Sequence, residues 1–192
     1  MAAGLRYTAV LDACVLYPAP VRDLLLSLAV ADLYTAKWTS DIEREWLENL
    51  LEDRTDLTRA QLERTCALMS KAIPDSKVED YERLIPTLTL PDEKDRHVLA
   101  AAIRCNADAI VTMNLKDFPP ETLDTHGIEV LHPDDFVMNQ IELSESDALG
   151  AIKSMRLRLR NPTQTATELI STMERCQMPL TASCLREWQT LI

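Results

Sequence analysis

The stretch that most constrains the fold runs from residue 90 to residue 118 and reads LPDEKDRHVLAAAIRCNADAIVTMNLKDF. It begins with a turn that holds Asp92 and Asp95, and an Ala-rich helical pattern follows. The chain then enters a short apolar run over residues 109–112, and Asp117 comes after that run. This order predicts a helix followed by a buried strand, with carboxylates at the start of the helix and just beyond the end of the strand.

The rest of the chain repeats this alternation of short apolar runs and amphipathic helical patterns. Residues 74–91 fit neither pattern well, and we expect an irregular segment with one short strand there. Short strands that alternate with helices predict an α/β fold, in which a doubly wound parallel sheet carries helices on both faces. Strands are expected near residues 7–11, 33–38, 109–112 and 127–131, and helices over 20–32, from Thr39 or Ser40, from Thr58 to before Pro74, from Pro133, over 145–160 after a capping box of Ser144 and Asp147, over 163–177 and over 181–191.

Composition excludes several classes of protein. Of the 192 residues 46% are hydrophobic, which is ordinary for a globular core, and no apolar run approaches the roughly 20 residues that a membrane span needs. The first thirteen residues lack the apolar core of a signal peptide, and the five cysteines are scattered without a C-x-x-C pair. We therefore expect a cytoplasmic protein with reduced thiols and no cysteine-based zinc site.

The charge is large and uneven. The net charge of −11 argues against simple electrostatic binding of nucleic acid. Residues 145–192 hold six basic and five acidic residues, which leaves 14 basic and 26 acidic residues in 1–144. An acidic body of this kind is either a solvated surface or a set of carboxylates in a pocket that a divalent cation must neutralise.

Several of these carboxylates fall at one predicted edge of the sheet, where the crevice of such folds lies beyond the carboxyl ends of the strands. Asp12 directly follows the first strand, and its charge must be paired or bound to a metal; pairing with Arg96 is the simpler alternative. Asp95 lies near the third position of its helix on the face that packs on the sheet, so it is either a ligand or, with Asp92 as N-cap, part of a cap worth about 1 kcal/mol. Asp117 serves either as a ligand or as a turn residue.

The helix after Thr39 adds two glutamates, Glu43 and Glu45, for which a solvated face is the alternative. Glu45 adjoins Trp46 at the edge of the apolar stripe and is favoured as the one that reaches inward. Clustered carboxylates suit Mg²⁺ or Mn²⁺, and a metal-bound water, or two metals about 4 Å apart, can attack a phosphodiester. The sequence has no Gly-rich phosphate loop, no G-x-S-x-G and no H-E-x-x-H, and its histidines lack metal-ligand spacing. His97 is expected on the helix surface.

The segments VLDACVLYPAPVRDLLL, TSDIEREWLENL and the 90–118 block together resemble PIN-domain proteins, and more narrowly the VapC-like ribonuclease toxins of bacterial toxin–antitoxin pairs. The resemblance covers roughly residues 5–140. It implies a metal-dependent endoribonuclease that holds one or two Mg²⁺ or Mn²⁺ ions, with RNA as substrate, a cognate antitoxin as partner and no membrane association; homodimers are common among similar proteins. The acids of the family fall on Asp12, Glu45, Asp95 and Asp117, with Glu43, Asp92, Asn114 and Thr112 as alternates or neighbours.

The resemblance also implies a PIN-like nuclease domain over residues 1–142 and a C-terminal helical extension over 143–192, which serves RNA contact, a protein partner or packing. One departure concerns Cys14, which stands where many members have a polar residue two positions after the first acid. Two other functions remain open. One is a catalytically inactive PIN module that binds RNA or protein, and the other is an Asp-nucleophile phosphotransferase, whose pattern needs an aspartate where Cys14 stands.

Overall fold

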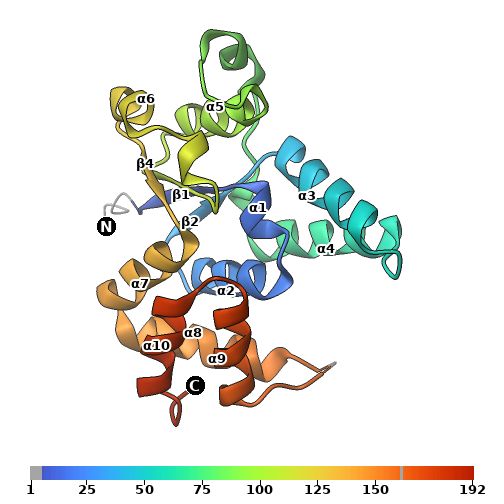
Figure 1. Cartoon of the computed structure of the whole chain (residues 1–192), viewed down its shortest axis with the longest axis vertical. Coiled ribbons are helices and arrows are strands. Elements are labelled where there is room, and N and C mark those ends of the chain that lie inside the picture. Colours follow the sequence, from blue (N-terminus) through green and yellow to red (C-terminus); the bar gives the residue numbers. More distant parts are fainter. Residues whose placement is uncertain (1–5, 161) are drawn as a thin grey trace. The chain divides into compact units, whose positions relative to one another are not determined.

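The computed structural model of the chain describes residues 6–160 and 162–192 (Figure 1). The first five residues, on which the expected lack of a signal peptide partly rests, lie outside the described part. Two compact units are formed, and each draws on two separate stretches of chain. The sheet unit comprises the chain up to Tyr17 and Thr35–His132, and the helical unit comprises Pro18–Tyr34 and Pro133–Ile192.

The sheet unit contains four parallel strands in the order β2-β1-β3-β4. Ala9 of β1 pairs with Ala36 of β2 on one side and with Ala109 of β3 on the other. The apolar runs are continuous because Ala9–Leu11 and all of β3 are completely buried. The predicted parallel sheet and α/β class are confirmed, with the strands β1 (Thr8–Leu11), β2 (Thr35–Lys37), β3 (Ala109–Val111) and β4 (Glu129–Leu131).

Helices of the sheet unit begin where the sequence provides caps. Thr39 accepts a hydrogen bond from the backbone N–H of Ile42 at the start of α3, as expected, and Thr58 forms a capping box with Gln61 at the start of α4. Helix α5 contacts β1 and β3, and its small buried residues over 100–102 allow close approach to the sheet. These helices are α1 (Ala13–Leu16), α3 (Ser40–Asp53), α4 (Arg59–Ala72), α5 (Arg96–Arg104) and α6 (Pro120–Leu123).

The segment that the sequence left irregular contains short 3-10 turns. The strand expected within residues 74–91 is reduced to one isolated bridge, in which Trp38 and Lys77 pair in parallel. Prolines at three positions of this segment remove backbone donors and prevent a longer ladder. The 3-10 turns of the sheet unit are η1 (Pro74–Ser76), η2 (Glu82–Thr87), η3 (Glu93–Asp95), η4 (Leu115–Asp117) and η5 (Asp124–His126).

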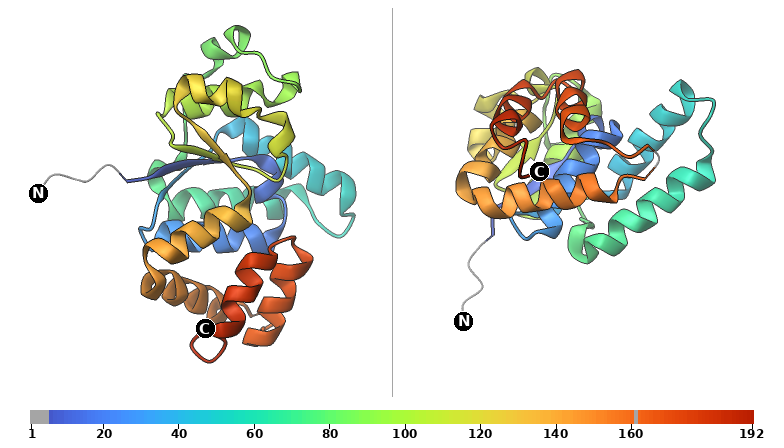
Figure 2. Two further views of the ribbon diagram at one scale, coloured as in Figure 1. Left: turned by 60° about the vertical axis from the view of Figure 1, so that its left-hand side comes forward. Right: turned by 90° about the horizontal axis from the view of Figure 1, so that it is seen from below.

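The helical unit is built from five helices around one apolar core. Helix α2 packs against α7, α8 and α9, while α10 packs against α7 and α9; the pairing of α9 with α10 is visible in red in Figure 2. Tyr34 and Phe136 meet edge to face with ring centroids 4.7 Å apart. The five helices are α2 (Ala19–Val30), α7 (Pro133–Leu143), α8 (Glu145–Arg158), α9 (Ala166–Arg175) and α10 (Pro179–Glu187).

Two polar features fix the ends of these helices. The buried carboxylate of Asp134 accepts hydrogen bonds from the backbone N–H groups of Leu180 and Thr181, both at 2.8 Å, and so caps α10. The capping box expected at Ser144 is not formed, because its hydroxyl donates to the Asp147 carboxylate at 2.7 Å instead of accepting from the backbone. No helix within the described residues is long and apolar enough to cross a membrane.

Candidate metal centre

The strand order places a topological switch point at β1. In the sheet β1 lies between β2 and β3, so the chain passes from β1 first to one neighbour and later to the other. Ligands of open α/β sheets bind beyond the carboxyl ends of the strands at such a point. Asp12 follows β1 and Thr112 follows β3, and the backbone N–H of Asp12 donates to the carbonyl of Val111 at 3.1 Å.

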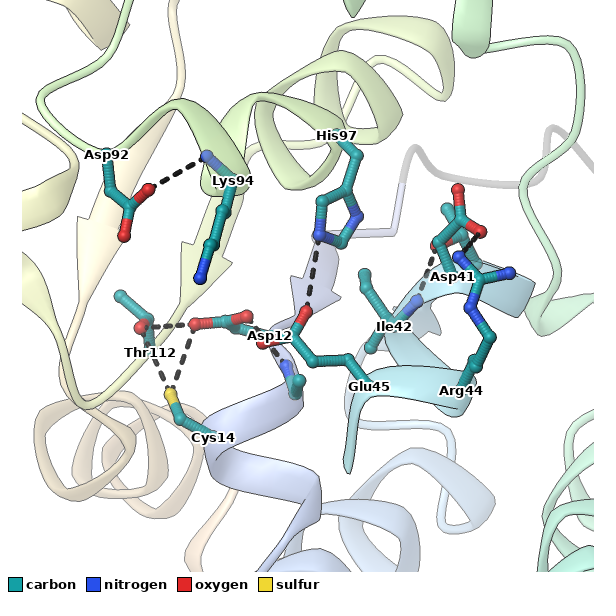
Figure 3. Close-up of polar contacts among 12 residues, drawn as sticks. Asp12, Cys14, Asp41, Ile42, Arg44, Glu45, Asp92, Lys94, His97 and Thr112 are labelled. Carbon is teal, nitrogen blue, oxygen red and sulfur yellow. Dashed lines mark hydrogen bonds and ion pairs between the residues drawn. The ribbon is translucent and has the colours of Figure 1, made fainter. Parts of the chain in front are cut away.

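Asp12 has a carboxylate that is 5% exposed and held by three donors (Figure 3). The backbone N–H of Ala13 donates to Oδ1 at 2.7 Å, while the Thr112 hydroxyl and the Cys14 thiol donate to Oδ2 at 2.7 and 3.1 Å. Burial raises the pKa of Asp12, the hydrogen bonds from Thr112 and Cys14 oppose that rise, and the charge of Glu45 adds to it. The alternative pairing with Arg96 is not formed, because that guanidinium pairs with Glu93 at 2.8 Å.

Cys14 and Thr112 form a small network around this carboxylate. The backbone N–H of Met113 donates to the Cys14 sulfur at 3.2 Å, and the N–H of Asn114 donates to the Thr112 hydroxyl at 3.0 Å. Burial, followed by the charge of Asp12, raises the pKa of the Cys14 thiol to about 12, so the thiol keeps the proton that it donates. The sequence suggested Thr112 only as an alternate; its signal was a hydroxyl directly after the apolar run of β3.

Asp95 and Asp92 have separate roles at the start of α5. Asp92 accepts a hydrogen bond from the backbone N–H of Lys94 at 2.9 Å and is the N-cap of η3, as predicted. Asp95 makes no side-chain capping bond. Burial is the largest cause that raises the pKa of Asp95 to about 7, and the charges of Asp12, Asp92, Asp117 and Glu45 follow in that order. The Asp95 carboxylate therefore lies within the electrostatic field of all the predicted ligands.

The two glutamates of α3 point to different surroundings. Glu43 accepts a hydrogen bond from the indole N–H of Trp38 at 2.8 Å and pairs with Lys77 at 2.5 Å. Glu45 lies 3.3 Å from Nε2 of His97, and its charge raises the pKa of both Asp12 and Asp95 (Figure 3). The geometry thus favours Glu45 as the glutamate of the centre.

His97 does not lie on an open helix surface, as the sequence predicted. Its side chain is 15% exposed, because the first turn of α5 faces α3 and the imidazole lies against Glu45. The Nδ1 atom of His97 is buried and has no hydrogen-bond partner in the described part of the chain. A contact between two helices about fifty residues apart gives no local signal, so only the fold could reveal it.

Asp117 and Asn114 belong to the turn after β3. The backbone N–H of Asp117 donates to the carbonyl of Asn114 at 3.0 Å, which closes η4. Asp117 is half-buried and acts on the pKa of Asp95, whereas Asn114 is exposed. Asp117 therefore belongs to the acidic group, and Asn114 lies at its edge.

The donor set fits a hard divalent cation in chemistry, although the side chains are not assembled around one. Within the described residues no three His, Cys, Asp or Glu side chains are close enough together to hold a metal ion. Like charges separate when no cation balances them, and Glu45 turns to His97. Glu45 keeps 43% of its side chain exposed and is free to rotate. Four carboxylates with mutual repulsion are the oxygen ligands that Mg²⁺ and Mn²⁺ prefer.

Two family models match the chain. The PIN domain model matches residues 8–116, and the model described as the VapC50 C-terminal domain matches residues 133–187. Over 62 residues the chain is 52% identical to "Putative ribonuclease VapC50" of Mycobacterium tuberculosis (strain ATCC 25618 / H37Rv). The aligned part is 32% of this chain and 37% of that protein, so the match spans about a third of each. No solved structure matches the chain significantly.

Proposed function

We propose, from the premise that this chain belongs to the PIN-domain family, that it is a metal-dependent endoribonuclease of the VapC type. The observation that carries the proposal is the convergence of acidic groups on Asp95, whose pKa is raised to about 7 by burial and by four neighbouring carboxylates. A site with this much uncompensated negative charge favours a divalent cation. The printed name of the Mycobacterium tuberculosis relative, a ribonuclease, supports the choice of RNA as substrate.

Asp12, Glu45, Asp95 and Asp117 would hold one or two Mg²⁺ or Mn²⁺ ions. Bound there, the metal would polarise the phosphate and make a water molecule more acidic. The chain's own contribution is to fix Asp12, because Ala13, Thr112 and Cys14 hold both of its carboxylate oxygens. Glu45 supplies a mobile carboxylate on the opposite side, which His97 holds until a cation draws it away.

The experiment that tests this function uses the full chain with a pool of cellular RNA. We expect cleavage with Mg²⁺ or Mn²⁺, and loss of cleavage with EDTA or in the Asp12→Ala variant. Asp12→Asn serves as a second variant of similar size, and circular dichroism checks that both variants fold. Absence of metal-dependent cleavage in every RNA pool, or equal cleavage by both variants, would contradict the proposal.

The VapC resemblance further supports a toxin of a toxin–antitoxin pair in the bacterial cytoplasm, with an antitoxin protein and a second copy of the chain as partners. Expression of the chain alone should then slow bacterial growth. Co-expression of a small protein encoded beside it should restore growth and should co-purify with the chain. Unchanged growth on expression of a chain that cuts RNA in the test tube would argue against the toxin role while leaving the ribonuclease intact.

A catalytically inactive PIN module that binds RNA or a protein is the second candidate. It is favoured by the lack, among the described residues, of three acids assembled for a metal, and by the hydrogen-bonded state of both Asp12 oxygens. This alternative predicts no metal affinity by calorimetry and binding of RNA or partner that survives Asp95→Ala. The ribonuclease predicts Mg²⁺ or Mn²⁺ affinity that Asp95→Ala abolishes.

A further inference from the structure

A pocket of about 560 Å³ opens beside Glu45, between α3 and the start of α5. Glu45 belongs both to this pocket and to the acidic group, so the pocket adjoins the proposed centre. Its lining comes from one face of α3 and from the first turns around α5, and it consists of Arg44, Glu45, Glu48, Asn49, Lys94 and His97.

The charges of this pocket differ from those of the acidic group. Glu48 pairs with Arg59 at 2.8 Å, so its charge is compensated. Lys94 is exposed, and its ammonium group forms no ion pair within the described residues. In Figure 3 the Lys94 side chain extends from its helical turn, and Arg44 lies on the other side of the Glu45–His97 pair. The pocket therefore offers an uncompensated cation to an incoming anion, next to carboxylates that would repel it.

The pocket also carries groups that suit the edge of a base. Asn49 lies one helical turn beyond Glu45 on the same face of α3, and its exposed carboxamide has both a donor and an acceptor. His97 adds an imidazole whose Nδ1 is unpartnered among the described residues. Amide and imidazole side chains of this kind read single-stranded RNA through base edges and stacking.

We propose that this pocket receives one unpaired nucleotide of the RNA beside the cleaved phosphate, with Lys94 pairing with its backbone phosphate and Asn49 contacting its base. The inference rests on the proposed ribonuclease function and narrows its substrate to RNA that is single-stranded at the cleavage site. A base within a duplex has its pairing edge occupied and is stacked, so it cannot enter a closed pocket without the cost of unpairing. The uncompensated Lys94 also accounts for how a chain with net charge −11 can hold RNA next to its acidic group.

The test is a binding measurement with the full chain, in which Asp12→Asn and EDTA suppress cleavage. The probe is a fluorescent RNA of about 12 nucleotides, single-stranded or annealed to its complement, followed by anisotropy. We expect the single strand to bind at least tenfold more tightly than the duplex. Lys94→Ala should weaken single-strand binding roughly five- to tenfold and reduce the slope of log affinity against log salt by about one.

Lys71→Ala is the matched control, because Lys71 is an exposed lysine on α4 and its loss changes the net charge equally. The control should bind like the parent chain. Asn49→Ala should flatten the differences in affinity among single strands of different base composition. Equal weakening by Lys94→Ala and Lys71→Ala, or equal affinity for strand and duplex, would overturn the proposal.

Cleavage kinetics separate this proposal from the proposed function. In a chain with Asp12 intact, Lys94→Ala should raise KM with little change in kcat, whereas Asp12→Ala should abolish kcat. If the chain cuts no RNA but binds single strands through Lys94, the catalytic proposal fails and the pocket stands. If it cuts single strand and duplex equally and Lys94→Ala leaves KM unchanged, the pocket proposal fails and the ribonuclease stands.

Discussion

Cys14 supplies both a donor and an acceptor at the most buried acid of the chain. Its thiol donates to Asp12 and accepts the backbone N–H of Met113. Because burial and the charge of Asp12 raise the pKa of Cys14 to about 12, the sulfur acts as a neutral hydrogen-bonding group and not as a nucleophile. It therefore does the work of the polar residue that many PIN domains carry at this position.

Replacing Cys14 by alanine removes one hydrogen bond to Asp12 and leaves the Met113 N–H without its acceptor. An unsatisfied buried donor costs about 1–3 kcal/mol, so we expect Cys14→Ala to lower kcat on RNA about tenfold or more. Cys14→Ser keeps a donor and an acceptor and should retain most of the rate. Equal rates for the alanine and serine variants would show that the thiol does not position Asp12.

The raised pKa of Asp95 makes the metal-free chain sensitive to pH. Between the usual value of 3.8 and the folded value of about 7, the folded chain holds a proton that the unfolded chain has released. The free energy of unfolding therefore falls as pH rises from about 4 to 7. We expect the melting temperature in EDTA to drop between pH 5 and pH 8, and to drop less, by roughly 2–4 °C, in Asp95→Asn.

The same variant tests the bound cation. Millimolar Mg²⁺ should raise the melting temperature of the parent chain at pH 8, because it binds the folded state only. It should leave Asp95→Asn nearly unchanged, since a ligand has been lost. Parallel pH profiles and identical responses to Mg²⁺ for the two proteins would show that Asp95 neither carries the raised pKa nor contributes to a metal site.

Residue roles were predictable from sequence only where they are local. The separation of Asp92 as cap from Asp95 follows from positions within one helix start, and the sequence predicted the cap correctly. The bond from Thr112 to Asp12 spans a hundred residues and depends on the pairing of β1 with β3. No local pattern specifies that register, so the role of Thr112 required the fold.

Helix α3 carries a structural and a candidate functional glutamate two residues apart. Glu43 joins α3 to Trp38 and Lys77, and its side chain is 15% exposed. Glu45 faces His97 and the pocket. Because successive residues of a helix diverge by about 100°, residues two apart face different neighbours.

We therefore expect opposite effects of truncating these two glutamates. Glu43→Ala should lower the free energy of unfolding by about 1–3 kcal/mol, because the half-buried Trp38 N–H and Lys77 lose their acceptor, while the folded fraction stays active. Glu45→Ala should keep the stability within about 0.5 kcal/mol and lose cleavage at least a hundredfold. Urea unfolding and RNA cleavage on the same preparations measure both, and the assignment of Glu45 fails if Glu43→Ala is the inactive protein.

At the level of elements, periodicity succeeded and short turns failed. Helices α3 and α4 carry apolar stripes with capping residues before them, and the sequence predicted where both begin. The segment from η1 to η3 has no repeat, because its prolines and single buried side chains such as Val78 and Leu88 anchor it one residue at a time. Packing of that kind is specified by tertiary contacts and leaves no periodic signal.

The division into two units was not legible in the sequence, because each unit is built from two separate stretches of chain. Helix α2 lies early in the chain yet packs with α7, α8 and α9, and an amphipathic pattern does not reveal its partner. The boundary expected after residue 142 falls within the helical unit, at the end of α7. It remains a prediction about domain organisation that truncation can test.

A chain ending at residue 142 would remove α8, α9 and α10 from the helices that pack on them. Completely buried leucines of α2, Leu24 and Leu28, would lose neighbours, and each buried leucine contributes about 1.5–3 kcal/mol. A few such losses match the total stability of a domain, so we expect the truncated chain to aggregate or to melt at least about 10 °C lower. A chain ending at Glu187 keeps all five helices and should melt near the full-length protein. If the chain ending at residue 142 instead melts cooperatively and cuts RNA like the full-length protein, residues 143–192 are a separable extension.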